Sequence, residues 1–466
     1  MLSKLVEEFL KEYLARRPYL LDKRESNERG TTKEELIKVL TDMEKLIRDN
    51  KDKTPEEIID LIIQDTIEEY EKVREKYMVP GYTFSSQVGN INAAVFGGKL
   101  STNGSAMTED ALFDIASMTK FYTQIIIYNL INKGYLKRSD KIADLDKSFP
   151  YLGDVTVDDI LTFGVAFTTP RIDKQENSID AMKAMHEARV VQIGKYDYND
   201  IGMMIMKEVA ETLTGKTFAE LFDIYIISPL KLKNTHLIVP KEKYSLITGS
   251  LNANVGLPSD IKACLSKDGY SGHAGAFASY SDIMTMMRAA KGGIILPNSE
   301  DTYTPGNLET AKGVLKDNMA RMGNVYVAHP KGIDKTWVTG IDPKDMSTVS
   351  GSTKTNAAAT YDSAYTVMFN QGSSSDEVLI ERLRQINEAK IKNGETPLST
   401  DIHVSKKIKG KNIDLRMVDM RELLPFESLE DPTIKTSELT LKLRFLDFVT
   451  RKYERDYETN YKKRVA

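Results

Sequence analysis

The sequence predicts an α+β fold: an antiparallel sheet flanked by helices, with an all-helical lobe inserted into it. Strand-like stretches rich in β-branched and aromatic residues occur early, at 82–95, and again late, at 355–361 and 364–370. Between about 155 and 292 the chain has helix or loop character almost throughout. Strands precede and follow this helical stretch in the sequence. We therefore expect the early and the late strands to form one layer, with the helical stretch inserted between them.

The N-terminal part of the chain is predicted to be helical. Two charged amphipathic patterns, at 6–21 and 33–47, indicate helices that cover another surface. A longer helix is expected to begin after the N-cap Thr54, which is followed by Glu57, and to end at Pro80-Gly81.

The remaining elements follow from turn residues and from the period of the apolar positions. A hairpin with its turn at Gly89-Asn90 is expected across 82–95, and a helix across 114–142 with a break at Gly134. Helices of the lobe are expected at 156–161, 201–213, 218–227 and 281–290. Late strands are expected at 324–327, 336–339, 355–361 and 364–370, followed by a helix at 377–391, a hairpin around 409–412 and a helix from 437.

This pattern divides the chain into three parts. An N-terminal helical extension occupies residues 1–50, and a main domain occupies 51–395, with the helical lobe at about 140–295. A C-terminal extension made of a hairpin and a helix occupies 396–466.

Composition narrows the classes of function. The chain has 466 residues, of which 41% are hydrophobic, so it can bury a large core. Its net charge of −4 and the lack of a basic block interleaved with aromatic residues do not favour a nucleic-acid partner. One cysteine, Cys264, excludes an internal disulfide framework, and five scattered histidines do not favour a metal site. We therefore expect no metal.

The start of the chain carries no signal-peptide pattern, because charged residues follow Met1 closely. No apolar stretch is long enough to span a bilayer. We expect a cytoplasmic protein, although a secreted chain trimmed of its leader would look the same. The sequence indicates no particular oligomeric state.

A serine and a lysine three residues apart, Ser117 and Lys120, precede a long apolar run at 121–131. On a helix this spacing stacks the two side chains on one face, so that the ammonium can reach the hydroxyl. Such a pair is a nucleophile beside its activator. The apolar run would take it into an interior with little water.

The same spacing occurs twice more, at Ser228/Lys231 and at Ser259/Lys262. A proline follows the first of these serines and an aspartate follows the second, so the two matches indicate a turn and a helix N-cap. Sequence context therefore favours Ser117.

A second group that handles protons is expected on the loop before the Met-rich helix at 201–213. Tyr198 and Asp200 stand two residues apart on this polar loop, so both side chains can face one cleft. The alternative is that Tyr198 packs on the surface and Asp200 caps the helix. Local sequence does not decide between the two.

Several motifs taken together resemble the penicillin-recognising serine hydrolase family, which includes class C β-lactamases, D-alanyl-D-alanine peptidases and related serine esterases. They occur in the family's order over roughly residues 54–391, at Asp110–Lys120, Tyr198–Gly202, Val209–Phe218, Pro229–Thr235 and Gly272–Ala278. The resemblance implies a β-lactamase/transpeptidase-like fold. It also implies that Ser117 is the acylated nucleophile, Lys120 its partner and Tyr198 the proton shuttle, with Asp200 where asparagine is usual.

The family's third motif, a basic residue followed by Thr-Gly or x-Gly on a strand beside the site, is altered here. One candidate is Val349-Ser350-Gly351-Ser352-Thr353, in which valine replaces the basic residue. The other is Lys354-Thr355-Asn356, in which asparagine replaces the glycine that lets a substrate backbone approach. We favour the first candidate, and both stay open. The family's usual His-Thr-Ser-Gly is also absent, with Phe163-Gly164-Val165 in its place.

The resemblance implies a serine hydrolase that acts through an acyl-enzyme on a small ester or amide and requires no metal or organic cofactor. The backbone N–H groups of Ser117 and Ser352 would hold the oxyanion, and Asp200, Ser350 and Gly351 would line the substrate site. Two alternatives stay open. One is a binding or regulatory homologue with weakened catalysis, and the other is an acyltransferase that uses the same serine.

Overall fold

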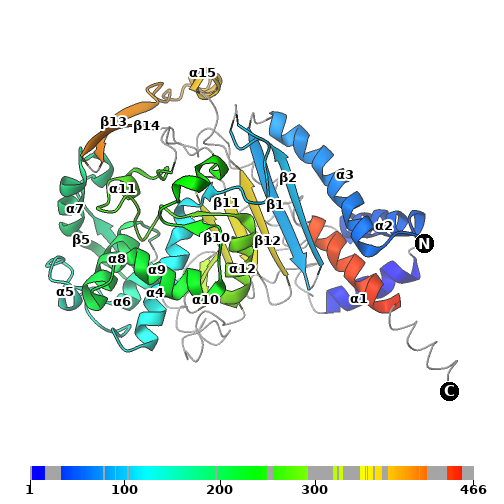
Figure 1. Ribbon diagram of the computed structural model, residues 1–466, viewed down its shortest axis with the longest axis horizontal. Coiled ribbons are helices and arrows are strands. Elements are labelled where there is room, and N and C mark those ends of the chain that lie inside the picture. The colour runs from blue at the N-terminus through cyan, green and yellow to red at the C-terminus, as the bar shows by residue number, and fades with distance from the viewer. Residues whose placement is uncertain are drawn as a thin grey trace.

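The computed structural model describes residues 3–15, 33–76, 79–89, 91–101, 104–194, 197–248, 256–291, 319–322, 325–328, 347–351, 353, 355–359, 363–369, 376–408, 410–416 and 438–453. Figure 1 shows a central sheet with helices on both of its faces, in agreement with the predicted sheet flanked by helices. None of the described helices is long and apolar enough to cross a membrane.

The central sheet is five-stranded, in the order β10-β11-β12-β1-β2, and each neighbouring pair is antiparallel. It joins the early and late ends of the chain, as predicted. The strands are β1 (Gly81–Val88), β2 (Ile91–Gly98), β10 (Ser347–Gly351), β11 (Thr355–Ala359) and β12 (Ser363–Phe369). Every residue of β12 is buried, because helices cover both faces of the middle of the sheet.

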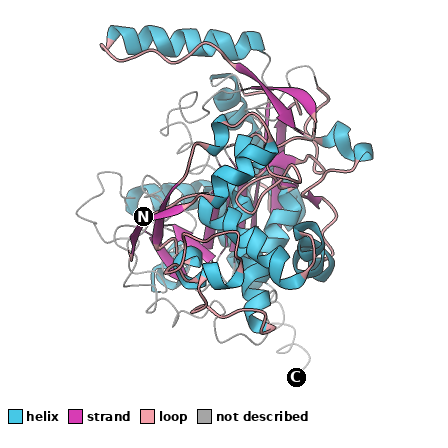
Figure 2. Ribbon diagram, turned by 90° about the vertical axis from the view of Figure 1, so that its left-hand side faces the viewer, coloured by secondary structure: helices cyan, strands magenta, loops and turns pink. Residues whose placement is uncertain are grey.

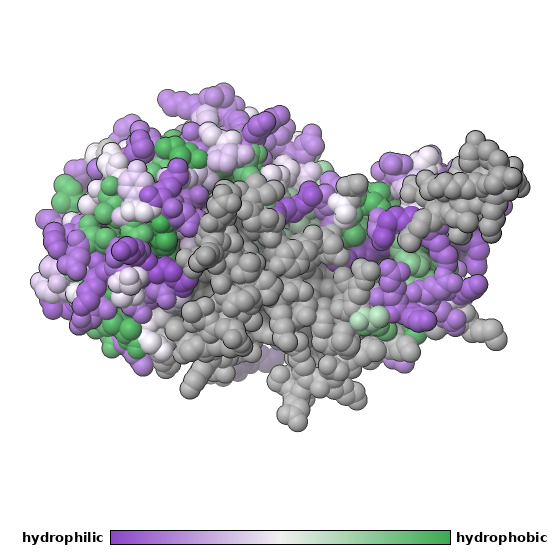
Figure 3. Space-filling model, turned by 90° about the horizontal axis from the view of Figure 1, so that it is seen from below, coloured by the Kyte–Doolittle hydropathy of each residue, from purple (hydrophilic) through white to green (hydrophobic). Residues whose placement is uncertain are grey.

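Helices from both ends of the chain pack on one face of this sheet. These helices are α1 (Lys4–Ala15), α2 (Lys33–Asp49), α3 (Pro55–Lys76) and a helix at 438–453. They share a single apolar cluster with β1 and β12, in which the ring of Tyr70 stacks on that of Phe84 with centroids 4.0 Å apart. Thr54 and Glu57 form the predicted capping box of α3. The outer surface of this layer, on the right of Figure 3, is mainly hydrophilic where it is not grey.

The opposite face of the sheet carries the larger core and the inserted lobe (Figure 1). Its long helices are α4 (Thr119–Asn132), α8 (Ile201–Thr214) and α12 (Tyr280–Lys291), and the Met-rich residues of α8 fill the core, as expected. The shorter helices are α5 (Ile142–Leu145), α6 (Val157–Leu161), α7 (Ser178–His186), α9 (Phe218–Phe222), α10 (Ser228–Leu230) and α11 (Ile261–Cys264).

The lobe is not purely helical, in contrast to the prediction. It contains an antiparallel hairpin of β4 (Val165–Thr168) and β5 (Arg189–Ile193). Most of β5 is exposed, so its residues carry no apolar–polar alternation that would indicate a strand. Three two-residue strands, β3 (Phe113–Asp114), β7 (Phe277–Ala278) and β6 (Thr235–His236), form a second small sheet.

The residues after the central sheet form an arm along one end of the molecule. It consists of α15 (Asp376–Lys392) and the hairpin of β13 (His403–Ile408) and β14 (Lys411–Arg416), which was predicted around 409–412. Figure 2 shows α15 standing away from the body. The hairpin reaches the lobe, where the N–H of Lys407 donates to the carbonyl oxygen of Glu176 at 2.9 Å.

Two short strands, β8 (Met319–Met322) and β9 (Val325–Ala328), pair with each other near the predicted strand at 324–327. The strand expected at 336–339 lies outside the described residues. The division at residues 50 and 395 stays a prediction.

Candidate active site

The segment that carries Ser117 is a strand, a turn and then a helix. The predicted helix from residue 114 begins only at Thr119, because Phe113–Asp114 pairs with β7 and Ala116–Met118 forms a 3₁₀ turn. Ala116 has φ of +43°, a strained value for a residue with a Cβ, and its N–H donates to Asp114 Oδ1 at 2.9 Å. This turn leaves Ser117 partly exposed although both neighbours are buried.

The side chains of Ser117 and Lys120 lie together, as their spacing predicted. Lys120 Nζ is 2.9 Å from Ser117 Oγ and 3.4 Å from the carbonyl oxygen of His273. Only 5% of the Lys120 side chain is exposed. The lysine is therefore a buried cation beside an accessible hydroxyl.

Asp200 is the counter-charge of this lysine. Its Oδ1 lies 2.7 Å from Lys120 Nζ. Asp200 makes no side-chain cap on α8, and the cap is provided by Asn199 Oδ1, which accepts from the N–H of Gly202 at 3.0 Å. The alternative in which Asp200 merely caps the helix is therefore wrong.

The charges around this pair shift both pKa values. Burial lowers the pKa of Lys120, but Tyr198 and Asp200 outweigh it and hold that pKa above its usual value. Burial raises the pKa of Asp200, but Lys120, His273 and Lys262 lower it far more. At neutral pH the site therefore holds an ammonium and a carboxylate.

Tyr198 lies at the open side of the site. Its side chain is 43% exposed, and Lys120 Nζ lies 4.8 Å from the centre of its ring. The ring packs against Phe163, 5.2 Å between centroids. Phe163 has φ of +49°, so a strained residue stands beside Tyr198 as Ala116 does beside Ser117.

The edge strand β10 brings part of the predicted third motif to the same place. A Cβ on Gly351 would lie only 2.4 Å from the carbonyl oxygen of Ile115, so no larger residue fits there without a shift. Thr353 Oγ1 donates to the carbonyl oxygen of Asp114 at 2.6 Å. Ser350 lies on β10 opposite Asn356 of β11. Ser352 and Lys354 lie outside the described residues, so the choice between the two candidate motifs stays open.

Sequence did not single out three residues of the site, which are Lys262, Asp260 and His273. Lys262 on α11 is ion-paired with Asp200 Oδ2. His273 is fully buried, and its Nε2 lies 3.0 Å from Asp260 Oδ1. Two sequence features pointed to this region: the match at Ser259/Lys262, which was set aside, and the motif that contains His273. Neither feature indicated that these residues lie close to Asp200.

The third match, at Ser228/Lys231, lies on the surface. Both residues are exposed, and Ser228 Oγ donates to the Asp223 carboxylate at 3.1 Å. The side chain of Ser228 thus makes a local contact of the kind expected at a turn.

Asp200, Asp260 and His273 offer ligand atoms that lie within 4.8 Å of one another. However, the ammonium groups of Lys120 and Lys262 each contact one oxygen of Asp200. A divalent cation would have to displace a lysine from a carboxylate whose charge is already compensated. The donor set therefore fits an ion-pair network better than a metal site.

Comparisons with known proteins place the chain in a family. The beta-lactamase family model matches residues 73–387. A putative D-alanyl-D-alanine carboxypeptidase of Escherichia coli (strain K12) is 24% identical over 228 residues, which cover 40% of this chain and 52% of that protein. The chain thus spans about half the length of the curated relatives that it matches.

Two solved structures share the fold. A class C beta-lactamase superimposes with a TM-score of 0.51 and 14% identity, over 66% of this chain and 91% of the other. A hydrolase described as having promiscuous acyltransferase activity gives a TM-score of 0.53 and 12% identity, over 68% and 94%. At these identities the likeness concerns the fold alone, and it confirms the expected β-lactamase/transpeptidase-like α+β architecture.

Proposed function

The chain belongs to the beta-lactamase family, and from this premise we propose that it is a serine hydrolase that cleaves a small ester or amide through an acyl-enzyme. One observation carries the proposal. A buried lysine lies 2.9 Å from an accessible serine hydroxyl and 2.7 Å from a carboxylate that keeps it charged. A hydroxyl in this setting is an activated nucleophile.

The first half-reaction acylates Ser117. The Ser117 hydroxyl attacks the substrate carbonyl, and its proton passes to the phenolate form of Tyr198, which acts as the general base. Lys120 stays protonated and stabilises the negative charge on the side-chain oxygens of Ser117 and Tyr198. When the tetrahedral intermediate collapses, Tyr198 returns the proton to the leaving alcohol or amine.

In the second half-reaction water takes the place of the Ser117 hydroxyl. Water gives a proton to Tyr198 and attacks the acyl-enzyme, and Tyr198 then returns the proton to Ser117 Oγ as the acid leaves. The backbone N–H groups of Ser117 and Ser352 would hold the oxyanion in both steps. The closeness of Gly351 to the carbonyl of Ile115 supports the pairing of these two segments.

The substrate class follows from the altered third motif. Valine at position 349 provides no cation for a substrate carboxylate. We expect small esters to be cleaved better than penicillins or peptide C-termini. An acyltransferase would use the same residues and differ only in its acceptor, an alcohol or amine instead of water.

Intact-mass spectrometry of the full chain tests the proposal. The protein is incubated with an activated ester, a fluorophosphonate or a penicillin, and Ser117→Ala serves as the control. We expect the ester and the fluorophosphonate to add mass at Ser117, with little or no addition by penicillin. Labelling of the Ser117→Ala variant, or of Ser228 or Ser259, would refute the assignment. A wild-type chain that none of the reagents acylates would be a binding homologue.

A further inference from the structure

We propose that Lys262 is a positioning residue of the serine site, which holds Asp200 in place so that Asp200 can hold Lys120. This inference rests on the proposed function, because it assigns Lys262 a role in the reaction of Ser117. Lys262 comes from α11 in the lobe, whereas Ser117 and Lys120 come from the segment that opens α4. The lobe thus supplies both Asp200 and Lys262 to a site whose serine and first lysine lie outside it.

The contacts at Asp200 are divided between two lysines. Oδ1 faces Lys120 Nζ at 2.7 Å, and Oδ2 is ion-paired with Lys262 Nζ. A carboxylate with a cation at each oxygen cannot rotate about its terminal bond without breaking an ion pair. Its position relative to Lys120 is therefore fixed from the side of Lys262.

The helix that carries Lys262 is anchored to the same site. Asp260 caps α11 by accepting from the N–H of Ala263 at 3.0 Å, and it also contacts His273 Nε2 at 3.0 Å. The carbonyl oxygen of His273 in turn faces Lys120 Nζ at 3.4 Å. These contacts close a ring that runs from Lys120 through Asp200, Lys262, α11 and His273 back to Lys120.

A further contact ties α11 to the segment of the nucleophile. The N–H of Ser259 donates to Asp114 Oδ2 at 2.6 Å, while Asp114 Oδ1 accepts from the strained Ala116 beside Ser117. One buried carboxylate therefore bridges the start of α11 and the turn that presents the nucleophile. The position of Lys262 is thus fixed relative to Ser117 as well as to Asp200.

The arrangement has a consequence for charge. Lys120 contacts only one oxygen of Asp200, because Lys262, which Asp260 also attracts, takes the other. The charge of Lys120 can therefore also act on the negative charge that forms at Ser117 or Tyr198. Without Lys262 the whole carboxylate is available to Lys120, and Asp200 is free to rotate. We expect both changes to slow acylation and to leave substrate binding intact.

The test uses Lys262→Met in the full chain, with Lys267→Met as the matched control, because Lys267 is an exposed lysine just beyond the same helix. Methionine retains most of the length of the side chain, and Lys262 lines a cavity of about 360 Å³, so truncation need not strain the packing. Acylation by an activated ester is followed by stopped-flow and by intact mass, and folding is followed by thermal unfolding.

We expect Lys262→Met to lower kcat by up to about tenfold, no more than the loss of the Asp200 charge itself, because Lys262 acts through the position of Asp200, with KM unchanged. Lys262→Arg should recover most of the rate, and Lys267→Met should equal wild type. In a double-mutant cycle, Asp200→Asn should make the Lys262 substitution much less costly.

Additive effects in that cycle, or a wild-type rate in Lys262→Met, would overturn the inference. If Lys262→Met does not fold, the same rates are compared for Lys262→Arg and for the double variant of Asp200→Asn and Lys262→Met. An inert wild-type chain would instead refute the proposed function, so the two failures can be told apart.

Discussion

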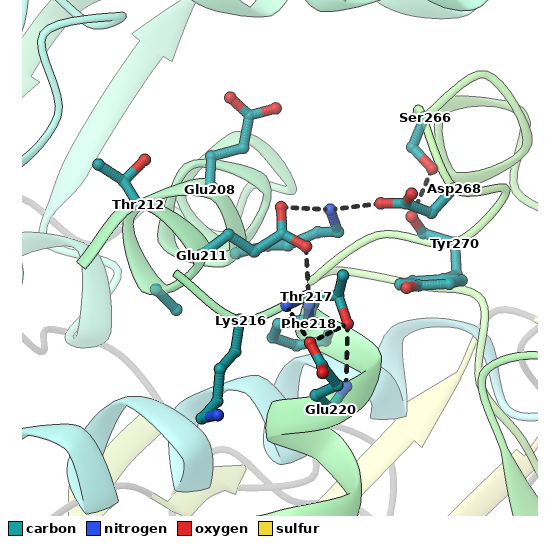
Figure 4. A network of polar contacts seen from close by, with 12 residues as sticks. Glu208, Glu211, Thr212, Lys216, Thr217, Phe218, Glu220, Ser266, Asp268 and Tyr270 are labelled. Atoms are coloured by element: carbon teal, nitrogen blue, oxygen red, sulfur yellow. Dashed lines mark hydrogen bonds and ion pairs between the residues drawn. The ribbon is translucent and has the colours of Figure 1, made fainter. Parts of the chain in front are cut away.

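Two lysines, Lys120 and Lys207, are almost equally buried and have very different surroundings. Their side chains are 5% and 6% exposed. Lys207 Nζ lies between two carboxylates, 3.0 Å from Glu211 and 2.9 Å from Asp268. Figure 4 shows the network to which these two acidic residues belong. Lys120 shares its one carboxylate with a second lysine and faces a hydroxyl.

The difference in charge balance separates a lysine that joins elements of the fold from the lysine to which we assign a role in the reaction. Two carboxylates compensate the charge of Lys207, so little of it acts on anything else. Figure 4 shows this network continuing through Glu211 to the N–H of Phe218, which starts α9. The contacts of Lys207 thus join α8, α9 and the loop of Asp268. Lys120 instead keeps positive charge beside the hydroxyl of Ser117, which supports the role that we propose for it.

Access separates the two clusters further. Each lysine lies near the face of a tyrosine ring, Lys120 at 4.8 Å from Tyr198 and Lys207 at 5.7 Å from Tyr270. Tyr198 is 43% exposed, whereas Tyr270 is 3% exposed. A substrate can therefore reach the first cluster through Tyr198 and Ser117.

The largest difference between the clusters should appear when each lysine is removed. Lys120→Met should lower kcat/KM for an activated ester by about a thousandfold or more, or at least about 4 kcal/mol, because the nucleophile loses its activator. Steady-state kinetics on the folded variant measures this loss. A variant that keeps more than a tenth of the wild-type activity would contradict the assignment of Lys120.

Lys207→Met should have the opposite effects. Its removal leaves Glu211 and Asp268 close together with no cation between them, which should lower the free energy of unfolding by about 3 kcal/mol. Activity per folded molecule should stay at the wild-type value. Urea denaturation and active-site titration with a fluorophosphonate measure the two quantities. A fall in kcat at full occupancy would mean that the clusters are coupled.

The sequence predicted the part of the site that depends on local spacing. Ser117 and Lys120 are three residues apart, and Tyr198 and Asp200 precede a strongly apolar helix, so their pattern could be recognised. The hairpin of the sheet and the capping box at Thr54 were predicted for the same reason, since turn and cap residues act on their immediate neighbours.

The rest of the site depends on contacts between distant segments. Lys262 and Asp200 are 62 residues apart, and nothing around either residue indicates its partner. The start of α4 was placed too early because Phe113–Asp114 pairs with β7, about 160 residues later, which overrides local helix propensity. The exposed strand β5 was missed because it has no buried face to impose alternation.

A smaller effect on activity should follow from introducing a cation at position 349 of β10. Val349→His or Val349→Lys should improve acylation by substrates that bear a carboxylate. The new charged hydrogen bond should lower the activation free energy by ~1.5–3 kcal/mol at most. Neutral esters should be unaffected. Relative kcat/KM for a penicillin and a neutral ester measures the change. Ready hydrolysis of penicillin by wild type would show that another cation, such as Lys354, already has this role.

The smallest effect is expected at Asp200, where an amide can replace the carboxylate. Asp200→Asn should keep the fold and lower kcat by about tenfold, or 1.4 kcal/mol, because the amide still bonds Lys120 but carries no charge. Tyr198→Phe should cost much more, because it removes the general base.

The pH dependence of Asp200→Asn decides whether this carboxylate keeps Lys120 protonated. Asp200 raises the pKa of Lys120, so its removal lowers that pKa, and the alkaline limb of the pH–rate profile should move to lower pH. The pKa of Asp200 is itself depressed in the folded state. Its ionised form therefore stabilises the fold above the unfolded pKa of about 3.9, and this stability is lost as the pH falls further. The variant should show a weaker fall in unfolding free energy below about pH 4, whereas identical pH–rate and pH–stability curves would show that Asp200 affects neither.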